Sequence, residues 1–453
     1  MTVRQPSATR RRAFARRPSA LFAGCVASVL LTASACGANG GSTSGKDGFN
    51  QVPQTDGTLT VWVDSVRLAA AKQYQQLHPK VKIDIVTYDG DANGSNYLQT
   101  KVQLFNRTGK GWPDVVFSTL NSEATWAVDA NFVAPLNKGL IPEATLGKFA
   151  KGANDVCTVD GKLYCLRNDL SQAVLWYNAP LMKKFGYTVP TTWEEYRKLG
   201  LKVAAEHPDY LVGDAGDAFT PDIYLWASKC GANDITGAKS VSVNTTSENC
   251  TKMAKLMDDL IRAKSMSISG VFSTDFGKNK ADKVLMMPGP AWYGGALFKD
   301  TFKTSAKRIA AAPMPQWSGE TSPSTGNVGG GTWLLSSHSA HLKAATDFLT
   351  WVTTDNAYQG EKAPTFPAYA PAAETWLKKQ NASGYYAGDI SVLQDASTQV
   401  WSGWGSGQFS QEAIWAATVK PGLTQGKTIV SLLPAWQDAI VKYAESDGYK
   451  VSQ

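Results

Sequence analysis

Four cysteines in the body of the chain have spacings that favour two local disulfides. Cys157 and Cys165 flank a short segment whose Asp160-Gly161 pair is typical of a tight hairpin turn, and Cys230 and Cys250 form the other pair. In an oxidising compartment each bridge would stabilise the fold by roughly 2–4 kcal/mol. A zinc site is the competing interpretation, but the paired C-x-x-C spacing of such sites is missing. We therefore expect disulfides and no metal site.

Motifs for several common enzymes are absent from the sequence. It contains no G-x-S-x-G, no phosphate-binding P-loop and no H-E-x-x-H. Two of its four histidines precede prolines, while His338 and His341 form an H-x-x-H pattern that is more often found on surfaces than in metal sites. Acidic residues are plentiful, so a glycoside hydrolase that uses two carboxylates with different pKa values stays open as an alternative.

The first 35 residues are typical of a secretory signal. Six arginines and no acidic residue precede an apolar run from Ala20 to Thr32, which at about 1.5 Å per residue is too short to cross a bilayer. The following Ala33-Ser34-Ala35-Cys36 resembles a bacterial lipobox, in which Cys36 is acylated and becomes the mature N-terminus. Residues 36–57 then comprise the lipidated cysteine and a flexible tether. Arg11-Arg12 also fits twin-arginine export, and the export route stays open.

The net charge of the chain comes from this leader. The chain has 45 basic and 38 acidic residues, and without the six leader arginines the counts are 39 and 38. A nearly neutral mature chain has no basic excess for nucleic acid. No later run of 18 or more apolar residues occurs, so we expect a lipid anchor on the extracellular face of the membrane and no spanning segment.

About 400 residues follow the leader, which is more than one hydrophobic core usually holds, so we expect two lobes. Strand-like and helix-like segments alternate, which favours an α/β fold. Strands are predicted at 59–63, 81–85 and 114–117, and helices at 68–77, 192–205, 247–264, 340–353 and 433–444. Thr192 and Glu195 predict a capping box. The helix at 247–264 carries an apolar stripe that favours core packing over a partner surface: Met253, Leu256, Met257, Leu260 and Ile261.

A series of short phrases runs in order through the chain after Thr58. The strongest stretch holds Asp160-Gly-Lys-Leu-Tyr164, Leu175-Trp-Tyr-Asn178, Phe185-Gly-Tyr187 and Pro190-Thr-Thr-Trp-Glu-Glu195. The other phrases are Trp112–Val116, Phe132–Leu136, Met287–Trp292, Ala312–Gln316, Gly329–Trp333 and Ala344–Trp351. In this order the set resembles the family 1 extracellular solute-binding proteins of bacterial carbohydrate ABC transporters.

The resemblance implies a two-lobe α/β fold of the type II periplasmic-binding-protein kind, with a ligand cleft between the lobes. The chain would cross between the lobes near 167–172, 308–311 and 358–366. The N-terminal lobe would then comprise residues 58–168 and 308–360, and the C-terminal lobe residues 169–307 and 361–453. The resemblance also implies a monomer that closes on a carbohydrate and delivers it to permease subunits, without a cofactor.

Polar side chains at the carboxyl ends of predicted strands are candidates for ligand contact. Asp64 and Ser65 follow the first strand, and Asp64 is the first candidate to accept hydrogen bonds from ligand hydroxyls, with helix N-capping as an equal alternative. Asn121 and Glu123 follow the strand at 114–117, where the family often contacts its ligand. Asp169 matches a position near the family's cleft, with a hinge salt bridge as the alternative.

Aromatic side chains are the second group of candidates, because their faces stack on the C–H faces of a sugar ring. The resemblance places a stacking aromatic at Trp292 and Tyr293. Trp333 follows three glycines that could bring the backbone close to a ligand, with burial as the alternative. Trp401 and Trp404 lie on a Gly/Ser-rich loop and would line the rim of the cleft or lie on the surface. The loop at 219–224 is a further candidate.

The class of ligand is the least determined feature of the sequence. Only Arg67 and Arg167 lie near the proposed cleft positions, which favours a neutral oligosaccharide over an anion. A lipid-anchored glycoside hydrolase and a binding protein for a non-sugar solute are the alternatives. An adhesion or scaffold lipoprotein would leave the ordered phrases unexplained.

Overall fold

The computed structural model describes residues 48–91, 95–237, 239–405, 407 and 409–453. The expected leader, the acylated Cys36 and most of the tether lie outside these ranges. Within them, no helix is long and apolar enough to cross a membrane. Two separate clusters of buried apolar side chains divide the described chain into two α/β lobes, as expected from its length.

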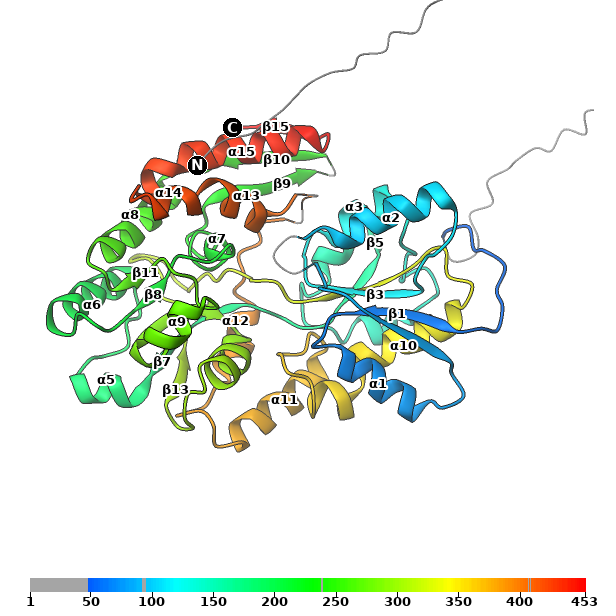
Figure 1. Ribbon diagram of the computed structural model, residues 1–453, viewed down its shortest axis with the longest axis horizontal. Coiled ribbons are helices and arrows are strands. Elements are labelled where there is room, and N and C mark those ends of the chain that lie inside the picture. The colour runs from blue at the N-terminus through cyan, green and yellow to red at the C-terminus, as the bar shows by residue number, and fades with distance from the viewer. Residues whose placement is uncertain (1–47, 92–94, 238, 406, 408) are drawn as a thin grey trace, which may run out of the picture. The chain divides into compact units, whose positions relative to one another are not determined.

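The N-terminal lobe is built on a five-stranded sheet with the order β2–β1–β3–β14–β6 (Figure 1). Its strands are β1 (Leu59–Val63), β2 (Ile83–Thr87), β3 (Val115–Ser118), β6 (Cys165–Arg167) and β14 (Thr332–Leu335). The first three strands in this order are parallel, whereas β14 runs antiparallel to both β3 and β6. Every residue of β3 and β14 is buried, as expected for central strands that are covered on both faces.

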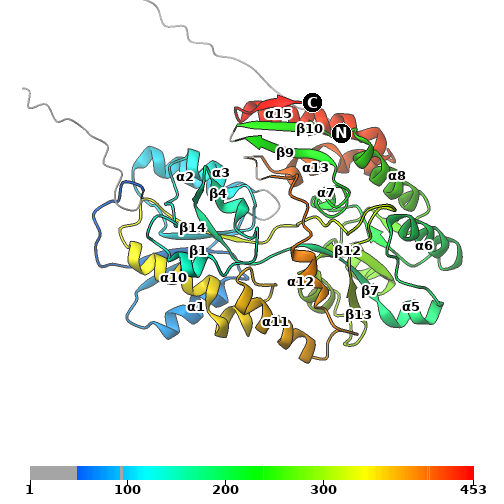
Figure 2. The same ribbon diagram turned by 180° about the vertical axis from the view of Figure 1, so that it is seen from behind.

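Helices cover both faces of this sheet. Figures 1 and 2 show α2 and α3 on one face and α1 and α10 on the other. The helices of this lobe are α1 (Leu68–Leu77), α2 (Tyr97–Thr108), α3 (Glu123–Asp129), α4 (Glu143–Leu146) and α10 (Leu342–Thr354). A hairpin of β4 (Thr158–Val159) and β5 (Lys162–Leu163) turns at Asp160-Gly161, and a disulfide joins Cys157 to Cys165 across it.

The C-terminal lobe contains three small sheets. Their strand orders are β12–β7–β13, β11–β8 and β15–β10–β9. The strands are β7 (Ala173–Asn178), β8 (Gly213–Asp214), β9 (Gly231–Gly237), β10 (Ser240–Asn244), β11 (Met266–Ser267), β12 (Met286–Pro290), β13 (Ile309–Ala312) and β15 (Lys450–Ser452). A second disulfide joins Cys230 to Cys250 in this lobe, so both expected cysteine pairs are bonded.

Helices surround these sheets. They are α5 (Ala179–Phe185), α6 (Trp193–Glu206), α7 (Thr220–Ile223), α8 (Glu248–Arg262), α9 (Thr274–Asn279), α11 (Ala370–Ala382), α12 (Val392–Ser397), α13 (Gln411–Thr418), α14 (Lys420–Thr424) and α15 (Ile429–Ser446). Short 3₁₀ turns occur at Asp155–Cys157 and Ala281–Lys283, and π-helical segments at Tyr293–Thr301 and Asn356–Gly360.

Local signals in the sequence determine several helix boundaries. Thr192 and Glu195 form the predicted capping box at the start of α6. The stripe of α8 packs into the core, with Met253, Leu256, Met257 and Leu260 buried, which confirms core packing. Helix α15 begins earlier than predicted, because the Thr428 side chain caps it by accepting a hydrogen bond from the Ser431 N–H. As a result, Pro434 lies inside the helix.

The chain crosses between the lobes three times, and one crossing differs from the expectation. The first lies between β6 and β7, as predicted. The second was expected at 308–311, but β13 pairs with β7 in the C-terminal lobe, so residues 308–326 belong to that lobe. The crossing instead follows Asn327, which forms a bridge with Gln172. The third crossing passes Pro367, which forms an isolated β-bridge with Asp169. Because the first crossing pairs in this way with both of the others, the three crossings lie side by side.

Candidate ligand-binding site

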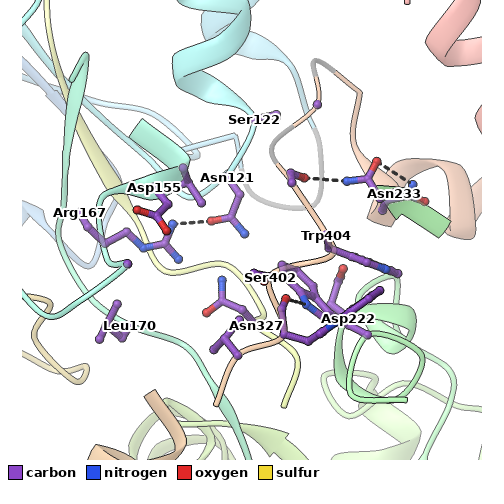
Figure 3. Close-up of a pocket in the computed structure, with 18 of the residues that line it drawn as sticks. Asn121, Ser122, Asp155, Arg167, Leu170, Asp222, Asn233, Asn327, Ser402 and Trp404 are labelled. Atoms are coloured by element: carbon purple, nitrogen blue, oxygen red, sulfur yellow. Dashed lines mark hydrogen bonds between the residues drawn. The ribbon is translucent and has the colours of Figure 1, made fainter. Parts of the chain in front are cut away.

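A cavity of about 540 Å³ is lined by residues of both lobes. Figure 3 shows Asn121, Asp155 and Arg167 of the N-terminal lobe on one side and Asp222 and Trp404 of the C-terminal lobe on the other. The crossing segments, with Leu170 and Asn327, contribute to the lining between these two sides. A ligand in this cavity would therefore contact both lobes at once.

Stacked indole rings form part of the wall from the C-terminal lobe. The centroids of Trp226, just after α7, and Trp404, before α13, are 4.9 Å apart with an angle of 27° between the planes. Trp226 donates its N–H to the Trp401 carbonyl at 2.7 Å, and Trp404 donates its N–H to the Cys230 carbonyl at 2.6 Å. Because both polar atoms are satisfied by backbone, these rings offer apolar surface to the cavity.

Polar side chains with unused hydrogen-bonding capacity lie beside these rings. Asp222 in α7 and Gln411 in α13 line the cavity and are 3% and 4% exposed. Asp222 Oδ2 and Gln411 Oε1 have no hydrogen-bond partner among the described residues. Burial, and then the charge of Glu412, raise the pKa of Asp222 well above its usual range. The raised pKa favours the protonated form of the Asp222 carboxyl, which has both donor and acceptor capacity.

The wall from the N-terminal lobe is centred on Arg167. This residue is 2% exposed and donates from Nη1 to the Asn121 side-chain oxygen at 2.5 Å, from Nε to the Asp169 carbonyl at 3.0 Å and from Nη2 to the Gly329 carbonyl. The Asn154 side-chain oxygen accepts a hydrogen bond from the backbone N–H of Arg167 at 2.9 Å. The adjoining cavity-lining segment 151–156 is thereby held against β6, together with the Cys157–Cys165 bridge.

Asp64 and Asp169 act in an ion-pair network at the crossings. Arg67 lies 3.2 Å from a carboxylate oxygen of each of them. Asp64 also accepts from the backbone N–H of Arg67 at 2.7 Å, which closes the turn before α1, whereas the N-cap position of the helix itself is Arg67. Asp169 also accepts from the backbone N–H of Gly331 at 3.0 Å, and its ion pair with Arg67 corresponds to the hinge salt bridge of the alternative interpretation. Neither residue lines the cavity, and Ser65 is exposed and lies outside it.

The structure buries three further predicted residues in the cores. Glu123 is 1% exposed and accepts from the Ser118 hydroxyl at 2.8 Å, and burial raises its pKa to about 8. Trp333 is fully buried and donates to the Asn168 side chain at 2.9 Å. Tyr293 is 1% exposed inside the C-terminal lobe. The glycines before Trp333 approach protein rather than ligand, because a Cβ on Gly330 would lie 2.3 Å from Arg167 Nη2.

Trp292 lies apart from the cavity in a separate aromatic group. It is half-buried, donates its N–H to the Val328 carbonyl at 3.1 Å, and has ring centroids 6.0 Å from both Phe219 and Phe272. It does not line the cavity. From the candidates that the sequence offered, the structure thus brings Asn121, Trp401 and Trp404 to one cavity.

Comparison with known proteins decides the family. The profile of the bacterial extracellular solute-binding proteins matches residues 59–359. The chain belongs to this family.

Curated and solved relatives agree with this assignment. The chain is 26% identical to an arabinooligosaccharide-binding protein of Bacillus subtilis (strain 168) over 341 residues, which cover 71% of this chain and 73% of the relative. Two solved structures share the fold. One is an ABC transporter associated binding protein from B. animalis subsp. lactis Bl-04 in complex with beta-1,6-galactobiose (TM-score 0.72, 21% identity, 87% and 99% coverage). The other is the galacto-N-biose-/lacto-N-biose I-binding protein of Bifidobacterium longum (TM-score 0.71, 18% identity, 89% and 100% coverage).

Sequence reasoning did not single out several residues that line the cavity of this solute-binding protein. Asp222 lies inside the candidate loop at 219–224, and Arg167 was noted only for its charge. Trp226 and Gln411 carry no local signal, because their importance comes from tertiary contacts between α7 and α13.

Proposed function

We propose that this protein is the substrate-binding component of an ABC importer and captures an oligosaccharide outside the cell. The observation that carries the proposal is the stacked Trp226–Trp404 pair next to the buried Asp222 and Gln411 in one cavity. A sugar ring needs an apolar surface for its C–H faces and donors and acceptors for its hydroxyls. This wall supplies both kinds of contact.

The relatives support a carbohydrate ligand. Besides the arabinooligosaccharide-binding protein, a multiple sugar-binding protein of Streptococcus mutans is 24% identical over 73% of this chain. Cleft closure gives such a protein its transport function, because the permease subunits can distinguish loaded from empty protein only if ligand favours one conformation. Here the crossings between the lobes would act as the hinge.

We place the mature protein on the extracellular face of the membrane. Acylation of Cys36 and the tether after it would hold a monomer close to its permease partners. The Arg-rich leader and the small residues before Cys36 support this placement. Loss of membrane association in a Cys36→Ala variant, with the protein still exported, would test it.

Ligand-dependent stabilisation tests the proposed function. A ligand that binds only the folded state stabilises it by RT ln(1 + [L]/Kd), so a cognate oligosaccharide raises the melting temperature of the leaderless protein. Asp222→Asn and Gln411→Ala should reduce that shift. A shift with amino acids, polyamines or metals, and none with a broad panel of sugars, would assign a different solute.

A glycoside hydrolase is the competing function, because the carboxyl groups of Asp222 and Glu412 line the same cavity and burial raises the pKa of Asp222. Product analysis separates the two functions. An importer component returns the oligosaccharide intact after long incubation, whereas shorter sugars would identify a hydrolase. Asp222→Asn would abolish the release of those sugars.

A further inference from the structure

The two arginines at the crossings have different electrostatic partners. Arg67 and Arg167 are both buried, at 8% and 2% exposure. Arg67 forms ion pairs with Asp64 and Asp169 at 3.2 Å each. Burial opposes its charge, but these two carboxylates raise its pKa above the usual value. The positive charge of Arg67 is thus compensated within the protein.

Arg167 has no such compensation. It forms no ion pair in the described part of the chain, and its three hydrogen bonds go to neutral oxygens of Asn121, Gly329 and the Asp169 backbone. Burial lowers the pKa of Arg167 to about 10, although the nearby charge of Asp169 raises it. Because a guanidinium stays charged at neutral pH, a buried positive charge without a carboxylate partner lies at the wall of the cavity.

Buried charges are normally paired, since moving an ion out of water is energetically costly. Three of the five N–H groups of Arg167 are used, which leaves one on each terminal nitrogen. Figure 3 shows this guanidinium extending toward the cavity beside Asn121. We propose that the ligand is an acidic oligosaccharide whose carboxylate pairs with Arg167. This inference rests on the proposed function and specifies the class of sugar for the same cavity.

The acidic side chains of the cavity are compatible with an anionic ligand. Asp155 makes no ion pair with Arg167, and burial raises its pKa. Asp222 lies across the cavity, and burial, and then the charge of Glu412, raise the pKa of its carboxyl, which favours the neutral form. Glu412 accepts a hydrogen bond from Ser410 at 2.7 Å within the C-terminal lobe. Among the described residues that line the cavity, Arg167 therefore supplies a buried positive charge that no carboxylate pairs.

A carboxylate fits this site better than a phosphate. The planar fork of a guanidinium matches a carboxylate in two parallel hydrogen bonds, whereas a dianionic phosphate usually recruits several cations or a helix N-terminus. The other basic residue that lines the cavity is Lys151, which is exposed. The sequence favoured a neutral sugar because it showed only Arg67 and Arg167 near the cleft. The structure separates these two residues and leaves one cation for the ligand.

Matched ligands test the proposal on the unmodified, leaderless protein. Calorimetry would compare digalacturonic, cellobiouronic and glucuronosyl-xylose disaccharides with their methyl esters, their neutral parents and a disaccharide 6-phosphate. We expect at least one uronate to bind about tenfold or more tightly than both its ester and its parent. Equal or tighter binding of the neutral forms overturns the inference but keeps the proposed function. Tighter binding of the phosphate assigns Arg167 to another anion. No binding by any of these uronates overturns the inference, whereas the proposed function fails only if the broad panel of sugars gives no thermal shift.

Substitution of the arginine provides a second test. Arg167→Gln should lower the uronate-to-neutral affinity ratio to near one, and this ratio isolates the charge pairing from any general effect of the substitution on the cavity wall. Arg167→Lys, which keeps the charge but loses the fork, should restore part of the ratio. Arg262→Gln is the matched control, because this side chain is 72% exposed on α8. Equal losses for charged and neutral sugars in Arg167→Gln would show a purely structural role.

Discussion

The indole rings of Trp226 and Trp404 stack at 4.9 Å although they come from distant parts of the chain. Their N–H groups are held by the carbonyls of Trp401 and Cys230, so neither ring can rotate without breaking a hydrogen bond. This fixation reduces the conformational entropy that a ligand must remove when it binds. The pair is therefore a preorganised part of the cavity wall.

Replacing Trp404 should weaken sugar binding. Trp404→Ala removes one stacked ring, and we expect at least about a tenfold loss of affinity, since such a platform contributes about 1.4 kcal/mol or more. Trp404→Phe should retain most of the affinity. Isothermal titration with the sugar found by thermal shift measures both, and urea denaturation monitors the fold.

Trp292→Ala is the informative comparison, because Trp292 lies outside the cavity. We expect it to change affinity by less than about threefold. Loss of binding in Trp292→Ala, with binding retained in Trp404→Ala, would move the stacking platform to the group formed by Trp292, Phe219 and Phe272.

The tryptophans of this protein illustrate how much of the structure could be predicted from the sequence. Local signals predicted α6 and α8 well, because a capping box and an apolar stripe depend on neighbouring residues. Trp333 and Trp404 both lie near glycines, yet one is buried in a central strand and the other lines the cavity. That difference arises from contacts between distant segments, which no short motif encodes.

The crossing at Asn327 was missed for a related reason. The sequence of a strand of small residues such as β13 does not indicate which lobe the strand joins. Only its pairing with β7 in the folded protein assigns it to the C-terminal lobe. By contrast, the sequence left both a ligand-binding and a structural role open for Asp64 and Asp169. In the structure both carboxylates form ion pairs with Arg67, a contact that depends on the tertiary fold.

Gly330 should be essential for the position of Arg167. Its φ of +84° is unfavourable for other residues, and a Cβ there would lie 2.3 Å from Arg167 Nη2 and 2.7 Å from the Asp169 carbonyl oxygen. Gly330→Ala should therefore reduce both stability and ligand affinity. Gly426→Ala is the matched control, because Gly426 has a φ of +80° and no atom within 4 Å of the added Cβ.

We expect Gly426→Ala to lower the free energy of unfolding by about 1 kcal/mol, from backbone strain alone, and to leave affinity unchanged. Gly330→Ala should cost at least about 1 kcal/mol more, since Arg167 must move. Urea denaturation and calorimetry measure the two quantities. Equal effects of the two substitutions would show that the approach of Arg167 to Gly330 is unimportant.

Glu123 should make the stability of the protein depend on pH. Burial, and then the charge of Asp91, raise its pKa from 4.5 to about 8, against the effect of the hydrogen bond from Ser118. Between these two values the folded state keeps a proton that the unfolded state releases. The free energy of unfolding should therefore fall as pH rises from about 4.5 to about 8, by up to about 1.4 kcal/mol per pH unit from this group.

Glu123→Gln removes the ionisation while keeping the shape of the side chain. The difference in unfolding free energy between this variant and the unmodified protein should increase in favour of the variant over the same pH range. Urea denaturation at a series of pH values measures it. A difference that stays constant from pH 4.5 to 8 would contradict the raised pKa of Glu123.

The disulfide that closes the longer loop should contribute more to stability, with a logarithmic dependence on loop length. The cysteines are separated by 8 residues in Cys157–Cys165 and by 20 residues in Cys230–Cys250. Loop entropy alone predicts losses of about 2.5 and about 3.3 kcal/mol when each pair is replaced by alanine. Urea denaturation of the two double variants measures these losses.

Ligand affinity should depend on the bridges in a different way. The Cys157–Cys165 bridge ends the segment 151–156 that lines the cavity, whereas Cys230 reaches Trp404 through its backbone carbonyl, which survives substitution. The first double variant should therefore lose more affinity, although it loses less stability. A larger loss of affinity in the second variant would show that the bridge to Cys250, rather than the carbonyl of Cys230, holds Trp404 in place.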